Sequence, residues 1–157
     1  MVSCNFYQAE KKDANNIFNL LKEFKSVKLS ACSEFKNDLL DCDYPDINED
    51  KVKTFINFML EKGKIICVQN LDTNKLIGVC IFCKSTYWWS EQETMIIQLI
   101  YVVEKYRNYQ IMKQLIDSVK QVSKDNPILI SITSKLQADK LFEKLGFENM
   151  GNNWRMK

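Results

Sequence analysis

The six cysteines and the absence of histidine together decide most of the chemistry open to this chain. Cys80 and Cys83 form a C-x-x-C pair, a spacing that redox and metal sites use. They lie in the apolar run Leu76–Cys83, where residues three apart on a strand point to opposite faces. We therefore expect two buried thiols, with redox or metal chemistry as the alternative. Without histidine, Ser-His-Asp triads, Cys-His dyads and His-containing zinc sites are excluded, and we expect no metal.

The glycines and the charge balance exclude further classes of function. The four glycines are too far apart to form a Gly-rich loop of the Walker or dinucleotide type. A net charge of +2 over 157 residues gives no basic excess, so we expect no nucleic-acid partner. The apolar runs are too short to span a bilayer, so we expect no membrane partner. The N-terminus lacks the pattern of a signal peptide, and a cytoplasmic location with reduced thiols is expected.

Hydrophobic spacing predicts the elements that must position any site, beginning with a strand and two helices. The strand covers Val2–Gln8, and Asp13 can cap a helix whose apolar residues recur at helical spacing. A second helix is predicted after Asn48, with Gly63 just past its end.

Three strands and a helix are predicted next. Lys64–Leu71 and Lys75–Lys84 flank a polar turn and form a hairpin. A turn around Trp88–Gln92 leads to a strand at Thr94–Val103. The polar segment Glu104–Gln110 then enters an amphipathic helix.

The C-terminal part adds a strand, a helix and a strand. Pro127 opens the strand Ile128–Thr133, Ser134 can cap a helix that Gly146 stops, and Phe147–Met156 supplies one or two final strands. The order is β-α-α-β-β-β-α-β-α-β, an α/β (α+β) fold with a mixed sheet and helices on both faces. One strand–helix–strand unit gives a parallel pair through a right-handed crossover. The absence of a long linker predicts one domain over residues 1–157.

Two segments carry a resemblance to a known family. Tyr101–Ile116 reads YVVEKYRNYQIMKQLI, and Ala138–Phe147 reads ADKLFEKLGF. They resemble the GCN5-related N-acetyltransferase (GNAT) superfamily, whose corresponding segments read roughly V-x-P-E-Y-R-G-K-G-I-G-x-x-L and A-x-x-x-Y-E-K-x-G-F. The resemblance implies a single GNAT-like acyltransferase domain with acetyl-CoA as cosubstrate.

The resemblance also implies where coenzyme A binds. The loop that enters the helix would hold the pyrophosphate through free N–H groups and the positive end of the helix dipole. Arg107 aligns on the Arg or Gln of the family and offers a fork of donors, although a solvated loop cation is the alternative. Backbone around Ile100 or Tyr101 would polarise the thioester carbonyl. The residues expected to bind the cofactor are Ile100, Val102, Arg107, Asn108, Tyr109, Gln110, Ile111, Met112 and Lys113.

Several positions depart from the family pattern. The motif glycines align on Gln110 and Met112, and Asn108 replaces another, so side chains stand where a ligand would approach the backbone. The tyrosine that protonates the leaving thiolate aligns on Phe142, which has no proton to donate. A positioned acid contributes about 10²- to 10⁴-fold, so its loss slows transfer without abolishing it.

The general base is also unusual, because the strand before the loop carries Thr94, Ile96 and Gln98 where many members place a carboxylate. Gln98 can hold a water that relays the proton of the amine, with Glu93 or Glu91 as a more distant acceptor. Gln98 and Glu93 are the candidate catalytic residues, with plain strand-surface roles as the alternative.

Two features bear on the acceptor and the partners. The segment Asp38–Asp50 contains six acids and no base, which suggests a cationic amine, with helix-start and solvated charges as the alternative. Tyr87, Trp88 and Trp89 can line the acceptor cleft, contact a subunit or pack on the sheet.

The predicted function is transfer of an acetyl group from acetyl-CoA to a primary amine of a small molecule or protein. The alternative is a degenerate GNAT-fold module with a binding or structural role. The sequence leaves open a monomer or a homodimer.

Overall fold

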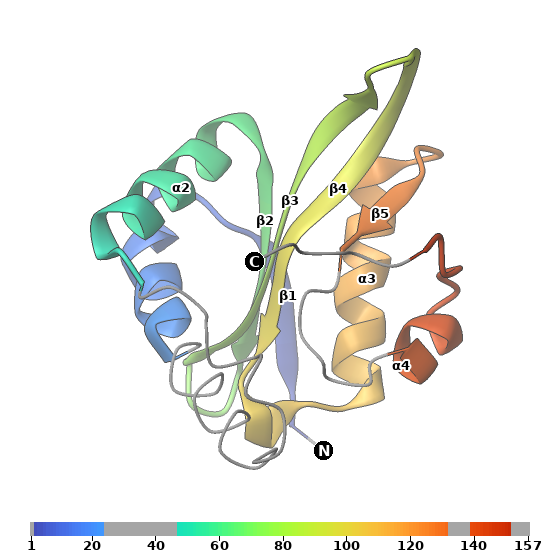
Figure 1. Ribbon diagram of the computed structural model, residues 1–157. Helices are drawn as coiled ribbons and strands as arrows, with labels where there is room; N and C mark the ends of the chain where they lie inside the picture. The colour runs from blue at the N-terminus through green and yellow to red at the C-terminus, as the bar shows by residue number, and fades with distance from the viewer. Residues whose placement is uncertain (1, 24–46, 132–138, 152–157) are drawn as a thin grey trace, which may run out of the picture.

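The computed structural model describes residues 2–23, 47–131 and 139–151, which build a five-stranded sheet in the order β1-β2-β3-β4-β5 (Figure 1). The strands are β1 Cys4–Gln8, β2 Lys64–Asn70, β3 Leu76–Tyr87, β4 Ser90–Val102 and β5 Ile128–Ile130. The first four pair antiparallel in chain order, whereas β4 and β5 are parallel. The helix α3, Tyr109–Ser123, makes the crossover between them, as the sequence predicts.

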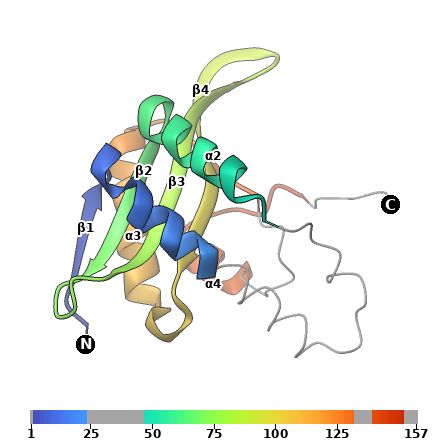
Figure 2. The ribbon, with the colours of Figure 1, turned by 90° about the vertical axis from the view of Figure 1, so that its left-hand side faces the viewer.

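Helices cover both faces of the sheet and bury two separate cores (Figures 1 and 2). On one face, α3 and the short α4, Asp139–Lys144, pack through residues such as Leu115 and Phe142. On the other, the helical residues 14–23 and α2, Glu49–Lys62, pack through residues such as Ile17 and Ile56. Alternation along the strands divides Ile66 and Cys67 between the two cores.

Local signals fix the ends of these elements. The Asn48 side chain accepts a hydrogen bond from the Lys51 N–H at 2.9 Å and caps α2, which Gly63 ends, both as predicted. At the first predicted cap the assignment is wrong. Asp13 lies within the short 3-10 turn Lys11–Asp13, and its carboxylate accepts from the Glu10 N–H, so Glu10 is the cap.

The C-terminal strand prediction is wrong for residues 147–151, which form no strand; the later residues of that prediction lie outside the described part. The Asn149 side chain accepts a hydrogen bond from the Gly151 N–H at 2.9 Å, and Gly151 has φ 130°, so this stretch turns instead of extending. The predicted strand at Ile128–Thr133 is shorter within the described residues and ends at Ile130. Ser134 lies outside the described part.

The β3–β4 hairpin is longer than predicted and projects beyond its neighbours (Figure 1). Its strands extend to Tyr87 and restart at Ser90, with Trp88 and Trp89 between them. Pairing of β2 with β3 reaches only Phe82. The sequence missed this extension because polar residues on a two-stranded ribbon give no core-facing alternation.

Candidate functional site

Strand β4 contains a β-bulge, and beyond it the side of β4 that faces β5 is open. Ile97 pairs with Phe82 and Leu99 with Ile81, so Gln98 is an extra residue without an opposite partner. Pairing with β5 involves only Met95, Ile96 and Ile97. Beyond the bulge, β4 stays paired to β3, and no strand among the described residues pairs with it on its β5 side.

The hydrogen-bond alternation of β4 decides which backbone groups face this open edge. The Val103 N–H donates to the Ile77 carbonyl of β3 at 2.9 Å. Every second residue of an antiparallel strand bonds to the same neighbour, so Tyr101, two residues earlier, also bonds to β3. Ile100 and Val102 alternate with it and direct their N–H and C=O groups away from β3. Of the two backbone positions predicted to polarise a carbonyl, Ile100 is the one whose N–H faces the open edge.

The N-terminus of α3 lies in the same region, because only the turn Glu104–Tyr106 and two further residues separate it from β4 (Figure 1). Asn108 caps the helix, and its side chain accepts from the Ile111 N–H at 2.9 Å. Its carbonyl accepts from the Met112 N–H. The N–H groups of Tyr109 and Gln110 stand in the first turn, where a helix supplies no acceptor. This end of α3 can therefore donate to an anion.

Arg107 is fixed at this junction by contacts with β4. Its Nε donates to the Val102 carbonyl at 2.8 Å, and its guanidinium carbon lies 5.8 Å from the centre of the Tyr101 ring. The side chain is nevertheless exposed. Its terminal nitrogens can donate to a phosphate while Nε holds the loop to the strand.

Gln110 and Met112, which replace the motif glycines, direct their side chains to different surroundings. Met112 packs partly buried against the α3-side core, so its side chain turns away from the solvent-facing first turn. Gln110 and Lys113 are exposed on that turn, and Lys113 forms an ion pair with Asp117. The loop can thus admit a ligand at its exposed side although its glycines are missing.

The two candidate catalytic residues are not brought together. Gln98 is exposed, and its Nε2 lies 3.6 Å from the Cys83 Sγ on the α2 side of the sheet. Glu93 shares the opposite face with Met95 and forms an ion pair with Lys84 at 2.9 Å. Hydrogen bonding and charge from Lys84 lower the pKa of Glu93, which makes it a weaker base. The geometry favours Gln98 as the residue beside the open edge.

Comparison with known proteins matches most of the chain to a known family. The model of the "Acetyltransferase (GNAT) family" matches residues 32–147, well over half of the chain. The chain belongs to the GNAT acetyltransferase family. The sequence resemblance is thereby confirmed, and so is the mixed sheet with helices on both faces.

Solved structures of acetyltransferases share the fold of this GNAT chain. A predicted acetyltransferase from Clostridium acetobutylicum, in complex with acetyl-CoA, has a TM-score of 0.73 at 14% identity and covers 99% of this chain and 96% of its own. A ribosomal-protein-alanine N-acetyltransferase from Brucella melitensis biovar Abortus 2308 has a TM-score of 0.68 at 14% identity, covering 99% of both chains. An aminoglycoside antibiotic 6'-N-acetyltransferase from Acinetobacter baumannii has a TM-score of 0.69 at 13% identity, covering 99% and 97%. At these identities they establish the fold alone. No curated protein sequence matches the chain.

The position of the family's acid is occupied by an apolar contact in this GNAT chain. Phe142 is 8% exposed and packs edge-on against Phe147 at 5.5 Å between ring centres. The nearby phenol of Tyr109 donates to the Lys144 carbonyl at 3.4 Å and so ties α3 to α4. Tyr109 was predicted as a cofactor-binding residue of the loop, and its contact with α4 was not predicted, because that contact depends on where α4 packs.

The two cysteines of the C-x-x-C pair do not act together, because their side chains lie in different cores and only Cys83 contacts Gln98. Cys80 is buried on the α3 side and Cys83 packs partly buried on the α2 side, as expected from strand alternation. Within the described ranges, no group of three or more potential ligands could hold a metal ion.

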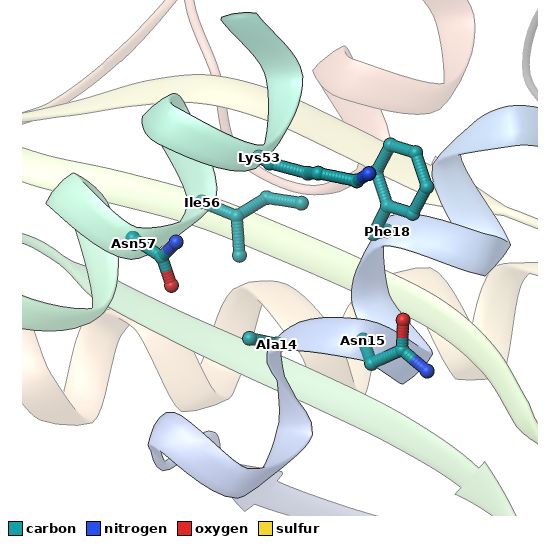
Figure 3. Close-up of a pocket in the computed structure, with 6 residues that line it drawn as sticks. All are labelled: Ala14, Asn15, Phe18, Lys53, Ile56 and Asn57. Carbon is teal, nitrogen blue, oxygen red and sulfur yellow. The ribbon is translucent and has the colours of Figure 1, made fainter. Parts of the chain in front are cut away.

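A shallow hollow of about 210 Å³ lies away from this site, between residues 14–18 and α2 (Figure 3). Lys53 leans over the Phe18 ring at 4.7 Å, and Ile56 forms the apolar floor. It contains none of the residues expected to bind coenzyme A. Most of the acidic segment Asp38–Asp50 lies outside the described residues; Glu49 and Asp50 occupy the first turn of α2, where acids favour the helix dipole.

Proposed function

We propose that this GNAT chain transfers the acetyl group of acetyl-CoA to a primary amine. The observation that supports this proposal best is the open β4 edge beyond the Gln98 bulge, beside the capped N-terminus of α3. The pyrophosphate of acetyl-CoA would accept hydrogen bonds from the first N–H groups of α3, and the thioester carbonyl would accept one from the Ile100 N–H. Acetyl-CoA complexes are also known among structures with this fold.

The chain contributes positioning and charge stabilisation to the reaction. The amine nitrogen attacks the thioester carbonyl carbon, a new C–N bond forms and the C–S bond breaks. The Ile100 N–H would donate to the carbonyl oxygen as negative charge develops on it. A water held by Gln98 would take the proton of the amine, and the leaving thiolate would gain a proton from water, since Phe142 has none to give. Glu93 stays a prediction as a more distant proton acceptor.

The acceptor is proposed as a primary amine of a small molecule or a protein, with a cationic amine favoured by the acidic segment Asp38–Asp50. We further propose that residues 1–157 act as one acyltransferase domain in the cytoplasm, without a nucleic-acid partner. In the described part of the chain, no helix is long and apolar enough to cross a membrane. A purely structural module gains no support from the site.

A ligand titration tests the proposal directly. Thermal unfolding is followed with acetyl-CoA, and with desulfo-CoA and ADP as partial ligands. A ligand at about 100 times its dissociation constant stabilises the folded state by about 2.7 kcal/mol, which is several degrees for a chain of this size. A saturable shift, followed by mass-spectrometric detection of acetylated amines from an amine library, is the expected result. No shift at millimolar acetyl-CoA would refute the proposal.

A further inference from the structure

The β3–β4 hairpin ends in a ribbon whose two outer edges are both unpaired in the described part of the chain. Residues 83–87 extend beyond β2, and residues 90–94 extend beyond β5. β2 cannot follow, because α2 ends at Gly63 beside the Phe82 carbonyl. β5 cannot follow, because Pro127 precedes it and has no N–H to donate. Bare strand edges of this kind pair readily with another strand.

The tip of this ribbon exposes a cluster of aromatic side chains. Trp88 is 91% exposed and Trp89 is 65% exposed. The Trp89 ring stacks on Tyr87 at 4.8 Å and meets Trp88 edge-on at 5.3 Å, so the three rings form one apolar surface. Tryptophan and tyrosine are enriched at the centres of protein interfaces and rare as isolated exposed groups.

Charge distinguishes the two edges of the ribbon. The β4 edge is irregular here, because the register shifts between Thr86 and Tyr87 and leaves Glu91 and Gln92 without opposite residues on β3. Antiparallel pairing of two β4 edges near these residues would also bring Glu91 and Glu93 of the two copies close together, which is unfavourable. Pairing of two β3 edges centred on Ser85 sets Lys84 opposite Thr86. Since Thr86 pairs with Glu93 in its own hairpin, Lys84 would then lie in one row with the Glu93 of the other copy. The β3 edge is therefore complementary to itself.

The aromatic cluster lies on the side of the sheet that such pairing requires. Cys83 packs on the α2 side, and alternation puts Ser85 and Tyr87 on the same side, with Trp89 stacked on Tyr87. A two-fold axis perpendicular to the sheet keeps α2 of both copies on this side. The tip of one copy then arrives beside Phe82 of the other, next to Gly63 at the end of α2. Phe58, near that end, is 57% exposed and offers apolar surface.

We propose that two copies of the chain form a symmetric dimer by antiparallel pairing of their β3 edges about Ser85, each aromatic tip packing on the end of α2 in the other copy. Every contact then occurs twice, as a closed two-fold interface requires. The exposed parts of Trp88, Trp89 and Phe58 in both copies amount to on the order of 800 Å². With the paired edges and their side chains, the total reaches the range of about 1,200–2,000 Å² typical of stable interfaces.

Sedimentation of the full chain tests this interface. The wild type is expected to be a dimer, and the double variant Trp88→Ser, Trp89→Ser is expected to raise the dimer dissociation constant by about 30-fold or more, the loss typical of one interface hot spot. Both tryptophans are exposed, so the variant keeps the fold, which its thermal unfolding checks. Met150→Ser removes a similarly exposed apolar side chain, at 84%, from the C-terminal end of the described chain and should leave the dimer intact.

A cross-linking experiment fixes the register. Ser85→Cys places two thiols opposite each other across the two-fold axis, and mild oxidation should join them as a Cys–Cys bond identified by peptide mass spectrometry. Gln92→Cys, on the β4 edge, is the matched control and should not join. The proposal would be overturned if the wild type stayed monomeric at the highest concentration tested. It would also be overturned by a dimer that the tryptophan variant leaves unaffected and that cross-links only through residue 92. Binding of the tip to lipid vesicles by a monomeric chain would overturn it as well.

Discussion

Arg107 has two tasks at the scale of the single residue. Its Nε holds the loop by donating to the Val102 carbonyl, and its terminal nitrogens stay available for a ligand. The motif of the family pointed to Arg107, but the bond to Val102 depends on the path of the chain after β4 and leaves no trace in the sequence. Replacement by lysine and by alanine separates the two tasks.

We expect Arg107→Ala to weaken binding of acetyl-CoA by about 1 to 3 kcal/mol, roughly 5- to 150-fold, because a charge-assisted phosphate contact is lost. Arg107→Lys keeps the charge but loses the bond of Nε to Val102 and the forked donors, so its effect should be smaller than that of alanine without being absent. Isothermal titration calorimetry measures both. An unchanged dissociation constant for the alanine variant would remove Arg107 from the phosphate site.

Gln98 is expected to act on the rate and not on donor binding. Gln98→Ala should lower kcat by about 10²-fold, the lower end of general-base contributions, with little change in KM for acetyl-CoA. Gln92→Ala, an exposed glutamine of the same strand, is the matched control. Glu93→Gln should have a smaller effect than Gln98→Ala, because Glu93 lies on the opposite face in an ion pair. Steady-state kinetics that rank Glu93 first would contradict this assignment.

The N-terminus of α3 is the element at which we propose that acetyl-CoA binds. Helices and strands could be predicted where caps, glycines and apolar spacing are local, as at Asn48 and Gly63. The helix start at Tyr109 was placed too late, because the polar run before Ile111 resembles a loop until Asn108 is seen to cap it. The Gln98 bulge could not be predicted either, because an extra residue in β4 is recognised only when its pairing with β3 is known.

Two substitutions at Asn108 separate the helix cap from the ligand. Asn108→Ala should lower the free energy of unfolding by about 0.5 to 2 kcal/mol, because the cap is lost. Asn108→Asp keeps a capping oxygen and should retain stability, but its negative charge should weaken binding of acetyl-CoA. Chemical denaturation and calorimetry provide the two readings. If the aspartate variant bound acetyl-CoA as tightly as the wild type, the pyrophosphate would not lie at this helix end.

The whole molecule buries several groups that must stay protonated in the folded state. Burial raises the pKa of the Cys67 thiol from 9.0 to about 12, and burial also raises the pKa values of Cys80 and Tyr7. The unfolded chain has ordinary pKa values, so above about pH 9 it releases protons that the folded chain retains. The contribution of these groups to stability is complete below that pH and is lost as the pH rises.

We therefore expect the free energy of unfolding to fall progressively as the pH is raised from 9. Urea denaturation at a series of alkaline pH values measures it. Cys67→Ala should flatten this dependence while it lowers stability at neutral pH, because a fully buried side chain is removed. Stability that stays constant through the alkaline range would contradict the buried positions of these thiols.

The bulge also indicates how selection acts on the residue at position 98. Ile97 and Leu99 already pair with consecutive residues of β3 and already lie on alternate faces, so the ladder and both cores would close without Gln98. Selection for stability alone would discard such a residue. A chain with Gln98 deleted should fold at least as stably as the wild type and lose acetyl transfer. Under the proposed function, stability and activity therefore make opposite demands on the residue at position 98.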